Sequence, residues 1–220
     1  MGQVFIPGEI EKYELCVILY LDPKRRKKGM SHFFAYMNKL KHIKRWSLMR
    51  NNEEENVKEH SFDVAMIAHA LAVIDNTYFG GKTDPERVMA LALFHETGEV
   101  ITGDLPTPVK YYNSQIHDAY KEVEEMGSRV IFGTLPDEMK DEYHDLIFHD
   151  GIEEYIYVKE ADKLCAYIKC LEELKSGNRE FMYAADRIRK ELDSMDREEV
   201  RFFMKEFLPS YELTLDELNK

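Results

Sequence analysis

The sequence predicts an all-α protein, a bundle of helices around one core with a short strand-like N-terminal extension. Apolar residues recur at helical spacing through most of the chain. Glycine and proline are scarce, at 11 and 7 of 220 residues, and they cluster between the periodic segments. The length suits one domain with a sizeable core. We therefore expect an extension over residues 1–29 and one helical domain over residues 30–220.

The extension stands apart from the helical pattern. Residues 4–21 resemble a strand or strand pair, and five basic residues follow at 24–28. Two interpretations remain open. Residues 1–29 are an N-terminal β-extension, or translation naturally starts at Met30 and the purine-rich codons before it belong to a ribosome-binding site.

The helical domain opens with two periodic segments. Residues 31–46 carry apolar side chains from Phe33 to Ile43 near a 3.6-residue period, which predicts a helix. Residues 57–74 repeat the pattern with Val57, Val64 and Leu71.

Helix-start and helix-stop signals define the next segments. Thr83-Asp84-Pro85 combines a capping residue with a proline in the first turn, so a helix should begin there and stop near Gly98. Two prolines make residues 103–108 a rigid loop. The remaining periodic segments predict helices at about 115–132, 137–148, 153–176, 179–193 and 197–207.

The charge balance excludes some partners. The chain has 42 Asp and Glu against 30 Lys and Arg, a net charge of −12. Lys and Arg supply most affinity for nucleic acid polymers and anionic membranes, so neither is expected as a partner. No apolar run approaches the roughly 20 residues of a membrane helix, and the start lacks a secretory-signal pattern. Three irregularly spaced cysteines indicate a reducing compartment, and hence the cytoplasm.

Two histidines lie on apolar helix faces. His60 shares a face with Val57 and Val64, and His95 shares one with Leu91 and has Glu99 one turn later. Such a histidine, taken alone, is more often a core residue than a ligand. The nearby carboxylates of Glu96 and Glu99 favour a metal site.

Asp162 is the third candidate ligand. It lies along an apolar face between Val158 and Cys165, where an unpaired carboxylate is costly and needs a cation. A salt bridge or a helix cap would also satisfy it. Imidazoles and carboxylates from three helices suit a divalent transition metal such as Zn, Co, Mn or Fe.

The order His60, His95-Glu96 and Asp162 resembles the H…HD…D signature of HD-domain metal-dependent phosphohydrolases. Within that superfamily, the chain resembles the bacterial 5′-deoxynucleotidases of the YfbR type from about Met30 to the C-terminus. The resemblance is carried by SHFF at 31–34, RW at 45–46, NV at 56–57, EHS at 59–61, TGDLPTPVK at 102–110, AD at 161–162, LCAY at 164–167, KCLEEL at 169–174 and FLPS at 207–210.

The resemblance implies a homodimer with an HD-domain fold that hydrolyses deoxyribonucleoside 5′-monophosphates to deoxyribonucleoside and phosphate. It implies one divalent metal per site, Co, Mn or Zn. The implied metal ligands are His60, His95, Glu96 and Asp162. The implied catalytic residues are Glu99, which activates water, and Arg45, which orients the phosphate. The implied substrate-binding residues are Arg45, Trp46 beside the sugar, and the loop Asp104, Leu105, Pro106 and Thr107.

One position departs from the family pattern, which has Asp where this chain has Glu96. Glu is one methylene longer, and metal–ligand distances tolerate only a few tenths of an ångström. Glu96 could ligate after a backbone shift, leave the metal to three ligands, or mark an impaired nucleotide-binding relative. Another HD-type nucleotide phosphohydrolase is a further alternative. The other functional positions are intact, which favours an active 5′-deoxynucleotidase.

Overall fold

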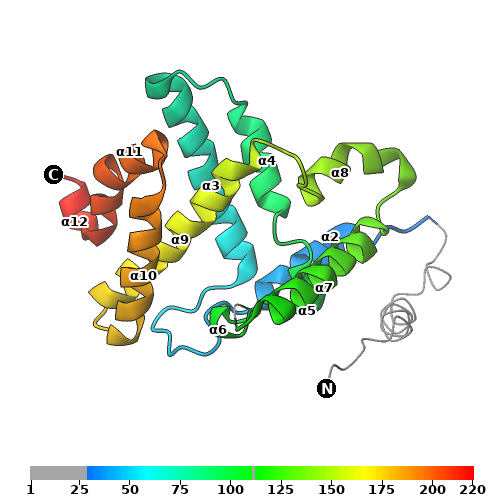
Figure 1. The fold of residues 1–220 in the computed structure, drawn as a ribbon, viewed down its shortest axis with the longest axis horizontal. Coiled ribbons are helices and arrows are strands. Elements are labelled where there is room, and N and C mark those ends of the chain that lie inside the picture. Colours follow the sequence, from blue (N-terminus) through cyan, green and yellow to red (C-terminus); the bar gives the residue numbers. More distant parts are fainter. Residues whose placement is uncertain (1–28, 111) are drawn as a thin grey trace.

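The computed structural model describes residues 29–110 and 112–220 (Figure 1). It confirms the all-α prediction, because the β pairing in these ranges is an isolated bridge between Lys44 and Asn56. The predicted strand-like extension lies outside the described residues. The elements are α2 (Phe33–Met37), η2 (Asn38–His42), α3 (Val57–Ile74), η3 (Asp75–Phe79), α4 (Pro85–Phe94), α5 (Glu99–Thr102), α6 (Thr107–Lys110), α7 (Ser114–Phe132), η4 (Asp137–Met139), α8 (Lys140–Ile147), α9 (Tyr155–Lys175), η5 (Arg179–Phe181), α10 (Met182–Ser194), α11 (Glu198–Glu206), η6 (Leu208–Glu212) and α12 (Leu215–Leu218).

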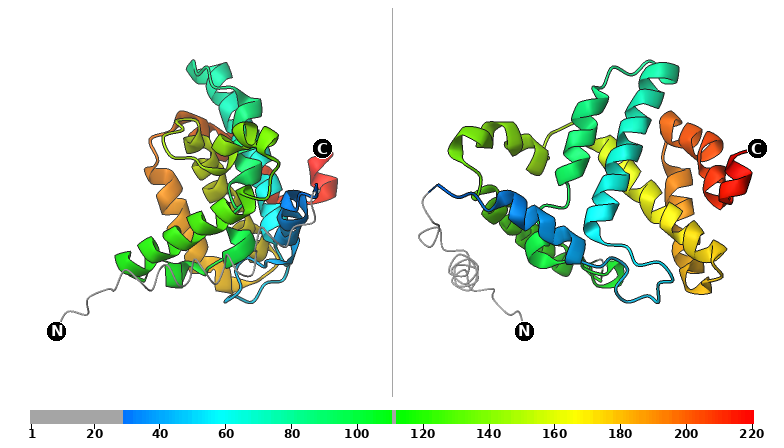
Figure 2. Two further views of the ribbon diagram at one scale, coloured as in Figure 1. Left: turned by 90° about the vertical axis from the view of Figure 1, so that its right-hand side faces the viewer. Right: turned by 180° about the vertical axis from the view of Figure 1, so that it is seen from behind.

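Helices α3, α4 and α9 form the centre of the molecule, with α9 crossing the other two (Figure 1). Their apolar faces are fully buried, as the helical periodicity predicts. Helices α10, α11 and α12 lie on one side of this centre, and α2, α7 and α8 lie on the other (Figures 1 and 2). The buried residues at the centre include Val64, Ala68, Leu71, Val88, Leu91, Ala92, Val158, Ala161 and Leu164.

The predicted starts of α3 and α4 are confirmed by their caps. Asn56 Oδ1 accepts from the backbone N–H groups of Lys58 and Glu59, at 3.1 and 3.0 Å. Asp84 caps α4 in the same way, with Pro85 as the first helical residue. Each cap satisfies N–H groups that a helix start leaves open. The caps therefore fix where α3 and α4 begin along the chain.

The first predicted helix is wrong at its C-terminal end. Helical structure begins at Phe33 and ends at His42, not at Trp46. Ile43 is extended, with φ −94° and ψ 113°. Periodicity could not reveal this end, because an apolar residue at 43 fits the helical spacing whether or not the backbone stays helical.

Backbone pairing competes with the helix at this point. Lys44 bridges to Asn56, and the Arg45 N–H donates to the Glu55 carbonyl at 3.0 Å. Trp46 then adopts a left-handed conformation with φ 56°, which is uncommon for a bulky residue. This turn places Arg45 and Trp46 next to the first turn of α3.

The loop predicted at 103–108 also contains some helix. Residues 103–106 are irregular, but Thr107–Lys110 form the single turn α6. Pro108 fits there because the first turn of a helix leaves its N–H groups unpaired.

A close backbone approach holds the segment between α4 and α5 against α7. A Cβ added at Gly98 would lie 2.5 Å from the Glu124 carbonyl oxygen, and one at Gly127 would lie 2.9 Å from the Gly98 carbonyl oxygen. Only glycine fits at both positions, so this packing holds the start of α5 against α7. No helix in the described ranges is long and apolar enough to cross a membrane.

Candidate active site

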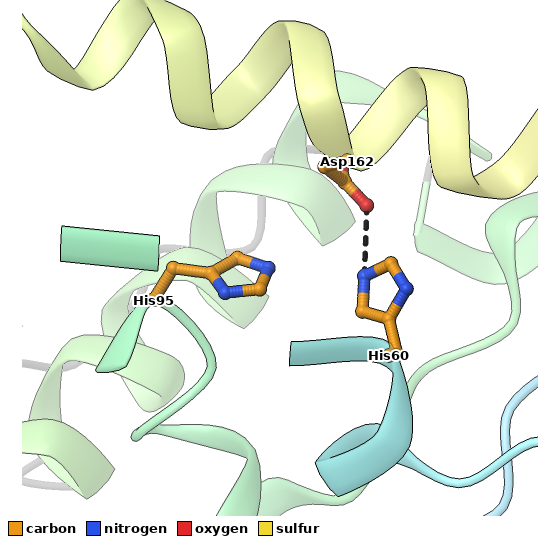
Figure 3. Close-up of side chains that lie close together, drawn as sticks. All are labelled: His60, His95 and Asp162. Atoms are coloured by element: carbon orange, nitrogen blue, oxygen red, sulfur yellow. Dashed lines mark ion pairs between the residues drawn. The ribbon is translucent and has the colours of Figure 1, made fainter. Parts of the chain in front are cut away.

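Three of the predicted metal ligands meet at one point (Figure 3). One ligand atom from each of His60, His95 and Asp162 lies within 4.8 Å of the others. His60 comes from the first turns of α3, His95 from the C-cap of α4, and Asp162 from the middle of α9. The three helices of the central core therefore converge on this group.

The electrostatics of the group favour a cation. The His60 Nε2 atom lies 3.0 Å from Asp162 Oδ1. Burial and the charge of Arg45 lower the pKa of His60, but the carboxylates of Asp162 and Glu55 outweigh them and raise it. Burial raises the pKa of Asp162, yet the contact with His60 and the charge of Arg45 hold it below its ordinary value. The Asp162 side chain is half exposed, so it faces the adjoining pocket rather than lying fully in the core.

The nitrogen atoms of the two histidines fit a metal. His95 Nδ1 lies 2.6 Å from the Ala92 carbonyl oxygen, which directs a proton to Nδ1 and leaves the Nε2 lone pair free. Among the described residues, the Nε2 atoms of His60 and His95 are buried without a hydrogen bond, although carboxylate oxygens lie 3.0 and 3.2 Å from them. A divalent metal between these atoms would satisfy both nitrogens and the carboxylates together.

Glu96 reaches the same place but is not one of the three convergent residues. Its Oε1 atom lies 3.2 Å from His95 Nε2 and 4.0 Å from an Arg45 Nη atom. Burial would raise its pKa, but the interaction with the His95 ring lowers it to about 2. The longer side chain therefore still carries a charged carboxylate to the centre.

Glu99 is buried one turn further along the chain. The residue is 3% exposed, and its Oε2 atom has no hydrogen-bond partner in the part of the chain that the structure describes. Burial raises the pKa of Glu99 well above the ordinary value, and the nearby charges of Glu96 and Asp104 raise it further. An unpaired, water-shielded carboxylate with a raised pKa has the properties of a general base.

Arg45 lies between the ligand group and the pocket. Its Nη atoms are each 4.0 Å from a carboxylate oxygen, one from Glu96 and the other from Asp162. Burial lowers the pKa of Arg45, but the surrounding carboxylates raise it above its ordinary value. The guanidinium is therefore a fixed positive charge at the centre.

A pocket of about 840 Å³ opens beside this centre, which is ample for a mononucleotide. Five of the six predicted substrate residues line it: Arg45, Trp46, Asp104, Pro106 and Thr107. Leu105 does not line it. Among the predicted metal ligands, Asp162 lines the pocket, whereas His60, His95 and Glu96 lie behind it.

One wall of the pocket was missed by sequence reasoning. Lys163 of α9 and Tyr183, Arg187 and Glu191 of α10 all line it. Lys163 and Arg187 both pair with Glu191. The spacing of the three α10 residues marks one helix face, but it looks like an ordinary solvated face until α10 is placed beside α9.

Two further residues near the centre, Glu55 and His149, were not identified as part of it from the sequence. Glu55 contacts His60, Arg45 and Trp46. The sequence offered no signal for it beyond its place before a helix cap. His149 stacks on Tyr155 with ring centroids 3.9 Å apart.

The architecture matches that of solved structures. The crystal structure of an HD-domain phosphohydrolase from Listeria innocua superposes with a TM-score of 0.72, at 23% identity, over 86% of this chain and 92% of that one. A conserved hypothetical protein from Pyrococcus furiosus superposes with a TM-score of 0.60, at 26% identity, over 81% of this chain and 96% of that one. The fold is that of the HD-domain phosphohydrolases.

Sequence comparison defines the family within that class. The pattern of the family described as 5′-deoxynucleotidase YfbR-like matches residues 32–211. A 5′-deoxynucleotidase from Klebsiella pneumoniae is 52% identical over 87% of this chain and 98% of its own length. The 5′-deoxynucleotidase YfbR of Escherichia coli is 50% identical over 86% of this chain and 96% of its own. The chain belongs to the YfbR-like 5′-deoxynucleotidase family, which confirms the resemblance.

Proposed function

We propose that this chain is a metal-dependent phosphomonoesterase that hydrolyses deoxyribonucleoside 5′-monophosphates to deoxyribonucleoside and phosphate. The observation that carries the proposal is the convergence of His60, His95 and Asp162 beside Arg45 and the unpaired Glu99. The relatives named 5′-deoxynucleotidase, at about half identity over nearly their whole length, support the substrate class.

We assign one divalent metal to the site, Co, Mn or Zn, held by His60, His95, Glu96 and Asp162. When bound, such a metal lowers the pKa of water and polarises a phosphoryl oxygen. The buried Nε2 atoms without hydrogen bonds support two of these ligands, and the nearby carboxylates supply compensating negative charge.

The side chains around the metal position have separate tasks. Arg45 holds and orients the phosphate through its planar guanidinium. Glu99 takes a proton from the attacking water at its unpaired Oε2 atom. Trp46 packs beside the sugar and excludes a ribose 2′-hydroxyl, while residues 104–107 hold the nucleotide. The pocket lining supports the placement of Arg45, Trp46, Asp104, Pro106 and Thr107.

A substrate panel tests this function. With Co, Mn or Zn supplied, we expect phosphate release from deoxyribonucleoside monophosphates and little from the corresponding triphosphates or guanosine polyphosphates. Preferred turnover of a triphosphate or a guanosine polyphosphate would instead support another HD-type nucleotide phosphohydrolase. No release with any metal would support the impaired nucleotide-binding relative.

Substitutions at Glu96 test whether the metal site is adapted to glutamate or impaired by it. We expect Glu96→Ala to weaken metal binding more than about tenfold, because it removes a charged ligand, whereas Glu96→Asp should retain binding and activity. Chelator competition and phosphate release measure both. Unchanged metal affinity in Glu96→Ala would show that this residue does not ligate, and a sharp gain of activity in Glu96→Asp would identify Glu96 as a defect.

We also propose that the enzyme is a cytoplasmic homodimer. The family resemblance implies the dimer. The few, irregularly spaced cysteines support a reducing compartment, and Cys165 and Cys170 are free and buried.

A further inference from the structure

Glu55 touches three functional side chains at once. Its Oε1 atom lies 3.2 Å from His60 Nδ1 and 3.3 Å from Arg45 Nε, and its Oε2 atom accepts a 2.9 Å hydrogen bond from Trp46 Nε1. One carboxylate therefore contacts a metal ligand, the phosphate-binding arginine and the tryptophan beside the sugar. The Glu55 side chain is only 15% exposed, so water screens these contacts weakly.

The backbone holds Glu55 in this place. Its carbonyl accepts the Arg45 N–H at 3.0 Å, and the next residue, Asn56, bridges to Lys44 and caps α3. Residue 55 is thus tied both to the turn that carries Arg45 and Trp46 and to the helix that carries His60. A carboxylate at this junction can set the distance between that turn and that helix.

A carboxylate complements all three neighbours, by a hydrogen bond from Trp46 and by charge contacts with His60 and Arg45. The facing atoms are nitrogens that carry hydrogen in the arginine and the tryptophan, and in His60 when Nε2 is free to bind metal. A carboxylate accepts at both oxygens, whereas a glutamine amide presents an N–H₂ group on one side. Glutamine at 55 would therefore turn a donor toward at least one nitrogen. Its single oxygen best serves His60 and Arg45, which leaves Trp46 unpaired.

Glu55 also controls where Arg45 can go. The Arg45 Nη atoms already lie 4.0 Å from Glu96 and from Asp162. If Glu55 no longer attracted Nε, the guanidinium would be drawn toward these two carboxylates, which would compete with the metal for them. The contact at Nε keeps the guanidinium between the ligand group and the pocket, where a phosphate can reach it.

We propose that Glu55 is a positioning residue that fixes His60, Arg45 and Trp46 in one arrangement. Through Trp46 it supports the discrimination between deoxyribose and ribose, a part of its role that rests on the proposed function. Through His60 and Arg45 it supports metal binding, which does not depend on the identity of the substrate.

The test uses Glu55→Gln and a matched control, Glu54→Gln. Glu54 is the neighbouring residue, its side chain is 71% exposed, and it pairs only with Lys44 among the described residues, so the control removes the same charge without touching the site. Trp46 is the only tryptophan in the chain, so its fluorescence reports directly on this contact. Emission and acrylamide quenching are measured without nucleotide in the zinc-loaded and metal-free proteins, and zinc affinity is measured by chelator competition.

In Glu55→Gln we expect a changed Trp46 emission maximum, stronger quenching and zinc binding weakened by about 10- to 100-fold. The ratio of kcat/KM for a deoxyribonucleotide over its ribonucleotide should fall about tenfold, as for loss of one charge-assisted hydrogen bond. Glu54→Gln should match the wild type in every measurement. Glu55→Asp keeps the charge but moves the carboxylate back by one methylene, so fluorescence, zinc affinity and the kcat/KM ratio should change in the same direction. This variant takes the place of Glu55→Gln if Glu55→Gln does not fold.

Wild-type fluorescence and zinc affinity in folded Glu55→Gln would overturn the proposal. A second outcome is that Glu55→Gln loses both the wild-type fluorescence and the wild-type zinc affinity, while the wild type itself does not hydrolyse deoxyribonucleotides. That outcome would keep Glu55 as the positioning residue and overturn the substrate assignment instead. Failure of the positioning role and failure of the proposed substrate therefore give different results.

Discussion

Replacing Glu99 by glutamine should lower kcat by about 10³-fold while the protein still binds metal and nucleotide. General acid–base catalysis contributes typically 10²- to 10⁴-fold, and the amide cannot accept a proton from water. Glu99 is buried and its Oε2 atom has no hydrogen-bond partner within residues 29–110 and 112–220, so the substitution removes little else. Phosphate release at saturating substrate measures kcat, and chelator competition and nucleotide titration measure binding.

A second buried carboxylate provides the control. Glu160 is 1% exposed and burial raises its pKa to about 7, but it pairs with Arg197 on another face of α9. Glu160→Gln should leave kcat within a few fold, even if it lowers thermal stability. An equal fall of kcat in both variants would show that loss of a buried carboxylate, not loss of a base, causes the effect.

Removal of the metal should abolish turnover and lower the melting temperature. Bound metal stabilises the folded state by about 2.7 kcal/mol when its concentration is 100 times Kd. For a domain of this size that corresponds to a fall of about 5–10 °C. His60, His95 and Asp162 come from three different core helices, so the metal would join elements far apart in the sequence.

Chelation followed by re-addition of Zn, Mn or Co makes this measurement. Activity and melting temperature should return together, and the metal that restores both at the lowest concentration is the preferred one. Full activity in protein freed of transition metal, verified by elemental analysis, would contradict the metal assignment.

The candidate metal ligands could be predicted because the spacing of apolar residues shows which side of a helix faces the core. His60 and His95 lie on apolar faces of α3 and α4, and Asp162 shares a face of α9 with core residues, so all three were expected to point inward. Capping residues and apolar repeats also predicted the helices that carry these three residues. Whether three such residues meet depends on how the helices cross, which only the structure establishes.

The contacts of Glu55 and the α10 wall could not be anticipated. Glu55 lies nine residues beyond Trp46 in an irregular segment, where neither periodicity nor a cap fixes the geometry. Tyr183 and Arg187 face the pocket only because α10 packs against α9. The helix end at His42 was missed for a related reason, since backbone pairing with residues 55–56 leaves no trace in the apolar pattern.

The most direct test of the central claim is the relative kcat/KM for a deoxyribonucleoside 5′-monophosphate and the ribonucleotide of the same base. It is measured with zinc, manganese or cobalt at a stoichiometry confirmed by elemental analysis. The structure places Arg45 and Trp46 side by side at the pocket that adjoins the ligand group. We therefore expect metal-dependent phosphate release that strongly favours the deoxyribonucleotide. Equal rates for the two sugars, or release that does not require a metal, would contradict this account.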